Sequence, residues 1–475
     1  MTTIHKKVFV NGDFNILHPG HLRLLKFAKE SGDYLTVALN NDTINKKGVN
    51  EEIRLESINA TSYVDEAFIL DVPILEYIKE HKPDIVVKGK EHEDKENPEL
   101  EILKQYGGKL IFSSGEIGFS SLDLLYENIS NSTSNIIHSY QFIKRHSILA
   151  NNIEKIIDNF KKLNVLVIGD TIIDEYITCD PVGMSQEDPT IVVTPLSSKK
   201  FIGGAAIVAS HAKTLGASVS YISVTGDDIN YEFTKQYLEE LEIDIALFKD
   251  TTRPTTLKQR FRAQNKSLLR VNHLKQHDIS IEIEEKILTK IKNIKENIDL
   301  IIFSDFSYGV LTPKLISQIE AIASQQNIFI VADSQSSSQI GDISKFNNML
   351  LVTPTEREIR LALNDFDSGL VVISEKLHKK SQNKYVVTTL GSEGILIYNS
   401  NKNELLTDNI SALNQNAKDV SGAGDSFLTS ASMALCAGAN IWESSYLGSI
   451  CAAIQVSRVG NIPIKKDEVL RELNF

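Results

Sequence analysis

Short apolar runs alternate with helical stretches along the first part of the chain. Val8–Val10 is an apolar run, a glycine-containing loop follows it, and Leu22–Glu30 then shows helical periodicity. Further strand candidates are Tyr34–Leu39, Ile85–Val87 and Leu110–Phe112. Strands separated by helices predict a parallel sheet whose crossover connections are helical. We therefore expect the chain to begin with an α/β domain.

A second series of strands and helices follows a polar boundary. The stretch Asn128–Asn135 is rich in asparagine and serine, and the mixed sequence after it is predicted to be a connector. Apolar strand candidates then resume at Val165–Ile168, Tyr221–Val224, Leu300–Phe303, Ile328–Val331, Tyr385–Thr388 and Ile395–Tyr398. A chain of 475 residues is too long for one ordinary core. We predict two α/β domains, residues 1–127 and 151–475, joined by residues 128–150.

The composition is that of a soluble globular protein, with 42% hydrophobic and 24% charged residues. The formal net charge of −12 argues against nucleic acid as a partner, although local donors can still hold a nucleotide. Cys179, Cys436 and Cys451 have no paired spacing, which argues against a disulfide framework or a zinc site. Met1–Lys7 has no apolar signal core, and no run is long enough to cross a bilayer. These features predict a cytoplasmic protein with no membrane partner.

A pair of histidines at the start of the first predicted helix is the first candidate site. In the segment Asn11–His21, His18 and His21 are three residues apart, where the first strand leads into the helix. Ligands of open parallel sheets bind at such strand ends. Two imidazoles beside a helix N-terminus suit a triphosphate. The structural alternative is a satisfied histidine pair beside a turn, but the whole string in this place favours a functional site.

This string resembles the HxGH signature of the cytidylyltransferase-like nucleotidyltransferases, and the resemblance covers about the first 125 residues. It implies a Rossmann-like domain in which a phosphate monoester attacks the α-phosphate of a nucleoside triphosphate and pyrophosphate leaves. Positioning and charge neutralisation would supply the catalysis. Asn15 is a departure, because cytidylyltransferases commonly have Asp there, whereas relatives that adenylylate also use Asn.

The same resemblance implies roles for individual residues of the first domain. His18 and His21 would stabilise the α-phosphate, and Lys46, with Lys47 beside it, would bear on the other phosphates. Taken alone, each basic residue could equally be a solvated surface charge. The nucleotide-binding residues implied are Gly12, Asp13, Phe14, Arg54, Lys88, Gly89, Ser120 and Ser121.

The second candidate site is the string Asp419–Asp425. Gly422 and Gly424 permit a compact loop whose N–H groups form an anion-binding nest. Asp425 stands at the N-terminus of the predicted helix Ser426–Ala437. A carboxylate there can accept the proton of an attacking hydroxyl while the nest holds the transferring phosphoryl group. The structural alternative is a glycine-rich helix start capped by Asp.

From about Ile153 onward, this string closes a series that resembles the ribokinase/fructokinase-like family. In detail it is similar to the kinase half of bifunctional heptose-7-phosphate kinase/heptose-1-phosphate nucleotidyltransferases. The resemblance implies a ribokinase-like α/β fold with a small lid, and it makes Asp425 the catalytic base. It implies nucleotide binding by Glu358, Gly391, Gly422, Ala423 and Gly424. It implies substrate binding by Asp170, Asp174, Gly203, Gly204, Lys258, Arg270 and Asp305, and Arg260 and Arg262 are further candidates for a substrate phosphate.

Three residues depart from the kinase pattern. Ile207 stands where the family has an Asn that can bond sugar hydroxyls, and Gln335 replaces a Lys near the nucleotide. Thr355 replaces an Asn that helps to organise Mg²⁺. Because Asp425 and its nest are intact, we expect a working kinase with altered sugar specificity. The alternative is a kinase-like half that acts only as a binding module.

Both halves of the bifunctional family are thus expected here, in reversed order, since the kinase usually comes first. The kinase would phosphorylate the anomeric hydroxyl of a heptose 7-phosphate with ATP. The transferase would transfer a nucleotidyl group, with adenylyl favoured, to a heptose 1-phosphate. The product, ADP-heptose, would be used for lipopolysaccharide or another surface glycan. The motifs leave open the nucleoside triphosphate and other acceptors, such as glycerol 3-phosphate. Mg²⁺ is expected to arrive with the nucleotide, with no predicted ligands. The resemblance also implies a homo-oligomer.

Overall fold

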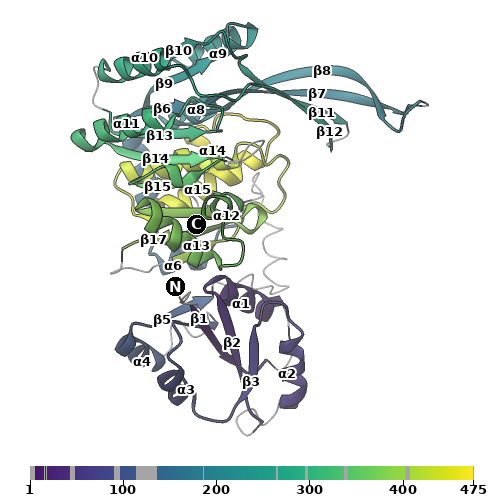
Figure 1. Cartoon of the computed structure of the whole chain (residues 1–475), viewed down its shortest axis with the longest axis vertical. Helices are drawn as coiled ribbons and strands as arrows, with labels where there is room; N and C mark the ends of the chain where they lie inside the picture. Colours follow the sequence, from purple (N-terminus) through teal and green to yellow (C-terminus); the bar gives the residue numbers. More distant parts are fainter. Residues whose placement is uncertain are drawn as a thin grey trace. The chain divides into compact units, whose positions relative to one another are not determined.

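The computed structural model of the chain describes residues 6–14, 17, 19–42, 49–89, 97–113, 136–185, 187–263, 266–294, 298–335, 341–401 and 407–473. The chain forms two compact units (Figure 1). One comprises residues 1–131 and 363–376, and the other comprises residues 132–362 and 377–475. In the described ranges, no helix is long and apolar enough to span a membrane.

Five parallel strands form the sheet of the first unit, in the order β3-β2-β1-β4-β5. The strands are β1 (Lys7–Gly12), β2 (Tyr34–Asn40), β3 (Glu66–Leu70), β4 (Ile85–Gly89) and β5 (Lys109–Ser113). The helices are α1 (Pro19–Glu30), α2 (Glu51–Asn59), α3 (Ile74–His81) and α4 (Glu99–Tyr106). Successive strand residues face opposite sides, so Val8 and Val10 join one apolar cluster and Phe9 joins another. The strand order reverses between β1 and β4, and the carboxyl ends of strands at such a point form ligand sites.

The second unit is built on a larger sheet in the order β10-β9-β6-β13-β14-β15-β16-β17-β18. Its strands pair in parallel from β10 to β16 and antiparallel from β16 to β18. The strands are β6 (Asn164–Gly169), β9 (Ser218–Thr225), β10 (Asp244–Lys249), β13 (Leu300–Asp305), β14 (Phe329–Ser334), β15 (Leu351–Val352), β16 (Tyr385–Thr389), β17 (Ile395–Asn399) and β18 (Thr407–Ile410). The strands predicted from apolar runs in this part of the chain are thereby confirmed.

Helices pack around this sheet (Figure 1). They are α6 (Tyr140–Arg145), α7 (Ala150–Asn159), α8 (Ala205–Leu215), α9 (Ile229–Glu240), α10 (Ile281–Lys292), α11 (Pro313–Gln326), α12 (Glu356–Leu363), α14 (Ala423–Cys436), α15 (Ile441–Val456) and α16 (Lys466–Arg471). A further helix, α13 (Leu370–Ser381), begins within the residues assigned to the first unit. Short 3-10 turns lie at Phe160–Lys162, Ile343–Lys345 and Gly391–Glu393. The small-residue helix α14 packs on α15 and α8, and these helices supply much of the apolar core.

A separate four-stranded sheet, in the order β12-β11-β7-β8, corresponds to the small lid that the sequence implies. Its strands are β7 (Thr171–Met184), β8 (Ile191–Gly204), β11 (Thr256–Ala263) and β12 (Lys266–His273). The β7–β8 pair extends well beyond the helices of the second unit (Figure 1). Asp174 of β7, Gly204 of β8 and Lys258 of β11 line the same cavity as Asp333 of β14, which is a strand of the larger sheet.

The described part of the predicted connector, residues 136–150, packs on the second unit. Phe142 and Ile148 are buried in its core. Arg145 forms an ion pair with Asp408 of β18, and His146 Nε2 lies 2.7 Å from Asp408 Oδ2. Part of the predicted connector therefore contributes to the stability of the second unit, and the exact domain limits stay a prediction.

Candidate active site

The turn after β1 brings three predicted residues of the first unit together. Phe14 adopts a left-handed backbone with φ of 47°, and its buried ring meets the His21 ring edge-on at a centroid distance of 5.1 Å. A Cβ on Gly12 would lie 2.9 Å from the Phe14 ring, so glycine leaves room for this turn. The result is that His21, in the first turns of α1, is positioned beside the end of β1.

Amide side chains join the ends of β1 and β2. Asn11 Nδ2 donates to the carbonyl oxygen of Ala38 and to Oδ1 of Asn40, both at 3.1 Å. Asn40 Nδ2 in turn donates to Asp13 Oδ1 at 2.7 Å. Asp13, which is predicted to contact the nucleotide, is thus held at the strand ends where ligands of such sheets bind.

The buried side chain of Arg54 contacts residues that follow both β1 and β2. Its side chain is fully buried, and Nε donates to the carbonyl oxygen of Val49 at 2.7 Å. Nη1 donates to the carbonyl oxygen of Asp13 at 2.7 Å, and Nη2 donates to Asp42 Oδ1 at 2.8 Å. In this structure the guanidinium positions the two loops, and direct nucleotide binding by Arg54 stays a prediction.

Lys88 and Gly89 end β4 at the same edge of the sheet. Lys88 Nζ donates to Asn97 Oδ1 at 2.9 Å and to Glu99 Oε1 at 3.0 Å. Because Glu99 is buried, this ion pair orients the lysine. The remaining residues predicted for this site lie outside the described ranges, so their roles stay predictions: His18, Lys46, Lys47, Ser120 and Ser121.

A cavity of about 730 Å³ lies in the second unit, beside the N-terminus of α14. This volume is within the usual range for small-molecule sites. The predicted residues in its wall are Asp174, Gly204, Lys258, Arg260, Glu358, Gly391, Gly422, Ala423, Gly424 and Asp425. Residues as far apart in the sequence as Asp174 and Asp425 therefore line the same cavity. Phe306, Arg357 and Asn461 also line the cavity, and none of them was predicted to bind a nucleotide or a substrate.

The loop before α14 has the tight turn that the predicted anion site requires. Gly422 has φ of 77°, and a Cβ there would lie 2.5 Å from Asn461 Oδ1, so the position requires glycine. Ala423 begins the helix, and the first N–H groups of a helix have no intrahelical partners. These groups and the helix dipole favour a phosphoryl group next to Asp425.

Asp425 is buried in the first turn of α14. Burial and, to a smaller extent, the nearby carboxylate of Asp174 raise the pKa of Asp425 to about 7, although Lys258 opposes the rise. A carboxyl group with this pKa exchanges protons readily near neutral pH, as a general base requires. Asn461 Nδ2 donates to Asp174 Oδ2 at 3.2 Å, which orients this second carboxylate.

The loop after β13 supports Lys258. The Lys258 Nζ atom lies 5.0 Å from the ring centre of Phe306 and 5.5 Å from that of Tyr308. Asp170 accepts hydrogen bonds from the backbone N–H groups of Phe306 at 2.8 Å and of Tyr308 and Val310 at 3.4 Å. Burial raises the pKa of Asp170 to about 6, and the carboxylate of Asp305 contributes to the rise. Asp170 thus shapes the loop, and its predicted contact with substrate stays untested.

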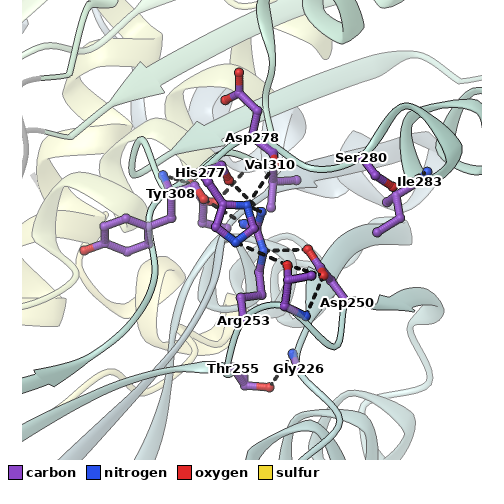
Figure 2. Close-up of polar contacts among 12 residues, drawn as sticks. Gly226, Asp250, Arg253, Thr255, His277, Asp278, Ser280, Ile283, Tyr308 and Val310 are labelled. Carbon is purple, nitrogen blue, oxygen red and sulfur yellow. Dashed lines mark hydrogen bonds and ion pairs between the residues drawn. The ribbon is translucent and has the colours of Figure 1, made fainter.

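Arg253 also holds this loop, through polar contacts that Figure 2 shows. Its Nη1 donates to the carbonyl oxygen of Tyr308 at 2.7 Å, and Nη2 donates to that of His277 at 2.6 Å. Nε donates to Asp250 Oδ2 at 2.8 Å within a buried ion pair. Gly309 has φ of 98°, and a Cβ there would lie 2.0 Å from the His277 carbonyl oxygen. Asp170 and Arg253 together fix the loop that carries Phe306 into the cavity wall.

Besides Asp170, three residues predicted to bind substrate are outside the cavity wall formed by the described residues. Asp305 is buried, accepts a hydrogen bond from Ser334 Oγ at 2.8 Å and pairs with Lys345 at 2.7 Å. Arg270 is exposed on β12. A Cβ on Gly203 would lie 2.5 Å from Asp174 Oδ2, so this glycine makes room for the aspartate. Substrate contact by these three residues stays a prediction.

The three departures from the kinase pattern have different surroundings. Ile207 is fully buried in the apolar core, so the expectation that its side chain faces the sugar is wrong. Thr355 lines the cavity and caps α12, because its N–H donates to Glu358 Oε2 at 2.7 Å and its Oγ1 accepts from Glu358 N at 3.3 Å. Gln335 also lines the cavity and contacts Asp425.

Comparison with known families agrees with the two predicted domains. Residues 9–114 match the cytidylyltransferase-like family, and residues 162–467 match the pfkB family of carbohydrate kinases. The molecule is therefore a two-domain α/β protein with a cytidylyltransferase-like domain followed by a ribokinase-like domain, as predicted. Because the second match covers more than half of the 475 residues, the chain belongs to the pfkB carbohydrate kinase family.

Curated relatives named bifunctional protein HldE are similar over much of the chain. The protein from Geobacter metallireducens is 29% identical over 329 residues, which are 68% of this chain and 66% of that protein. The protein from Aliarcobacter butzleri is 32% identical over 316 residues, which are 65% of this chain and 64% of that protein. The chain thus spans slightly less than two thirds of the length of these relatives.

Solved structures show the fold of the second unit. Phosphofructokinase-2 from Escherichia coli, in complex with substrates and products, aligns with a TM-score of 0.54 at 16% identity. The alignment covers 66% of this chain and 98% of that chain. Ribokinase from Thermotoga maritima aligns with a TM-score of 0.52 at 21% identity, over 66% of this chain and 100% of that chain. At these identities the likeness establishes the ribokinase-like fold alone.

Proposed function

We propose that the chain is a bifunctional cytoplasmic enzyme of nucleotide-activated sugar synthesis. The second unit phosphorylates the anomeric hydroxyl of a heptose 7-phosphate with ATP. The first unit transfers an adenylyl group to a heptose 1-phosphate, giving ADP-heptose and pyrophosphate. The two family matches and the likeness to proteins named bifunctional HldE support this assignment. The observation that carries it is the buried Asp425 beside a helix N-terminus in a cavity that also holds cationic side chains.

Asp425 accepts the proton of the sugar hydroxyl in the proposed kinase reaction. The hydroxyl oxygen bonds to the γ-phosphorus of ATP as the bond to the β–γ bridging oxygen breaks and ADP leaves. The N–H groups at the start of α14 stabilise the charge on the transferring group. We assign Arg260 to the phosphate of the sugar, because it is a cationic side chain in the cavity wall. Its Nη1 donates to Ser421 Oγ at 2.7 Å, and its Nη2 lies 3.4 Å from Asp174 Oδ1.

Mg²⁺ enters this proposal as a companion of the nucleotide, held largely by phosphate oxygens and water. Its chemistry would be to neutralise charge on the phosphates. Within the described ranges, no group of three or more His, Cys, Asp or Glu side chains could hold a metal ion, so no protein ligand is assigned. The chain's own residues orient the sugar and receive its proton.

Pyrophosphate release by the full chain tests the first unit. Each of the four nucleoside triphosphates is offered with heptose 1-phosphate or glycerol 3-phosphate, and ATP with heptose 1-phosphate should react fastest. His18→Ala should abolish this release and leave the kinase activity intact, because the two phosphate sites lie in different units. Fastest release from CTP with glycerol 3-phosphate would instead support a cytidylyltransferase with another acceptor.

The assembly proposed for the chain is a homo-oligomer. Large apolar side chains are exposed along the β7–β8 pair, at Val182, Met184, Ile191, Val192 and Leu196. Grouped exposed apolar residues of this kind mark interaction surfaces. Light scattering of the purified chain should give at least twice the mass of one chain, and Ile191→Glu should lower the mass. A wild-type mass equal to one chain would contradict this assembly.

A further inference from the structure

Gln335 bridges two buried carboxyl groups in the wall of the kinase cavity. It directly follows β14, and its backbone N–H donates to the carbonyl oxygen of Asp305 at 2.8 Å. Its side-chain Nε2 lies 3.3 Å from Asp333 Oδ2 and 3.3 Å from Asp425 Oδ1. Asp333 belongs to β14, whereas Asp425 lies 90 residues after Gln335 in α14. One amide therefore connects the central sheet to the helix that carries the proposed base.

We propose that Gln335 is a positioning residue for phosphoryl transfer, which holds Asp425 by donating one hydrogen of its amide to Asp425 Oδ1 and the other to Asp333. The proposal rests on the kinase function proposed for Asp425. With Oδ1 held by the amide, Oδ2 is left to accept the proton of the sugar hydroxyl. An amide NH₂ has two hydrogens and no net charge. It can therefore fix two acids without a cation that would neutralise the one acting as base.

Because Asp425 lies among buried charged groups, the charge of the side chain at position 335 should affect its pKa. Burial raises the pKa of Asp333 well above its usual value, and the carboxyl groups of Glu358 and Asp425 contribute to the rise. Burial likewise raises the pKa of Asp425 to about 7. A cation at position 335 would favour ionised Asp425, and a further carboxylate would disfavour it. The charged groups that line the cavity with Asp425 are Asp174 of β7, Lys258 and Arg260 of β11, Asp333 of β14, and Arg357 and Glu358 of α12.

The pH dependence of kcat/KM tests the proposal, because its acidic limb reports the base of the free enzyme. The full chain is assayed with whichever sugar phosphate the wild type phosphorylates. Gln335→Lys should move the acidic limb to lower pH by about one to three units. Gln335→Leu removes the donor and should move the limb to higher pH, and Gln335→Glu should move it further. The Leu variant should lower kcat more than it raises KM.

A matched control uses an amide that bonds a carboxylate on the surface. On α9, Gln236 Nε2 donates to Glu240 Oε1 at 3.0 Å in an exposed hydrogen bond, and Gln236→Leu should leave the pH profile unchanged. An acidic limb at the same pH in all three Gln335 variants would overturn the proposal. A positioning effect predicts the order Lys, Gln, Leu, Glu from low to high pH, which a loss of folding would not produce.

A second measurement needs no substrate. Since the pKa of Asp425 is raised on folding, its contribution to stability is present below about pH 4 and is lost as the pH rises toward about 7. Thermal melting from pH 4 to 8 should show this loss at lower pH in Gln335→Lys than in the wild type, and Asp425→Asn should lack it. If Gln335→Lys lost stability over the same pH range as the wild type, the role of Gln335 would be overturned. If the pH range of this loss shifted in Gln335→Lys but the chain phosphorylated no heptose, the role of Gln335 would be supported and only the proposed substrate would be rejected.

Discussion

Asp425→Asn should lower kcat for sugar phosphorylation by about two to four orders of magnitude, while KM changes little. Asparagine fills the same space but cannot accept the proton of the attacking hydroxyl. A base acts as the new bond forms, so its loss affects the transition state more than the bound substrate. Steady-state kinetics of ATP-dependent phosphorylation, with both substrates varied, measure the two constants separately. Pyrophosphate release by the first unit should be unaffected.

Asp467→Asn is the matched control for this variant. Asp467 also lies in the first turn of a helix, α16, but it is exposed. Its kinetics should equal those of the wild type. An unchanged kcat with a raised KM in Asp425→Asn would place Asp425 in binding rather than in proton transfer. Failure of the wild-type chain to consume ATP with any sugar phosphate would favour the binding-module alternative.

Arg253→Met should destabilise the second unit by about 3–5 kcal/mol. The substitution keeps much of the apolar stem but removes the partner of buried Asp250. It also leaves the carbonyl oxygens of Tyr308 and His277 without their guanidinium donors. Trp442 of α15 is the single tryptophan of the chain, so its fluorescence during urea unfolding reports on the second unit alone.

Lys235→Met provides the comparison for Arg253→Met. Lys235 and Glu239 form an i,i+4 pair on α9 with an N–O distance of 3.9 Å, and both side chains are largely exposed. Such pairs contribute no more than about 1 kcal/mol, so this variant should unfold close to the wild type. If Arg253→Met unfolded at the same urea concentration as the wild type, Arg253 would not be what fixes the loop after β13.

The apolar runs located the larger sheets well, for a physical reason. Val165–Ile168 and Leu300–Phe303 form strands buried on both faces, and such strands are continuous apolar runs. The lid strand β11 was harder to recognise, because Lys258–Arg262 alternates charged and uncharged residues with intermediate exposure. Its position depends on pairing with β7 and β12, which is a tertiary contact.

The same distinction applies to the kinase site. Gly422–Asp425 is a local turn and helix start, so its sequence was sufficient to predict this local geometry, and the role of Asp425 as a base stays a prediction. The bond between Gln335 and Asp425 spans 90 residues, and the bonds from Asp170 go to backbone N–H groups of a distant loop. Sequence patterns identified Asp170 but not its contacts. Almost every residue has a backbone N–H group, so the sequence does not indicate which of these groups bonds to Asp170.

Transfer of the labelled γ-phosphate of ATP by the full chain tests the central claim most directly. The acceptors compared are heptose 7-phosphate and fructose 6-phosphate, and ³¹P NMR identifies the position that is phosphorylated. The account predicts transfer to the anomeric hydroxyl of heptose 7-phosphate, roughly tenfold faster or more than transfer to fructose 6-phosphate. Transfer to heptose 7-phosphate that is no faster than transfer to fructose 6-phosphate would contradict it.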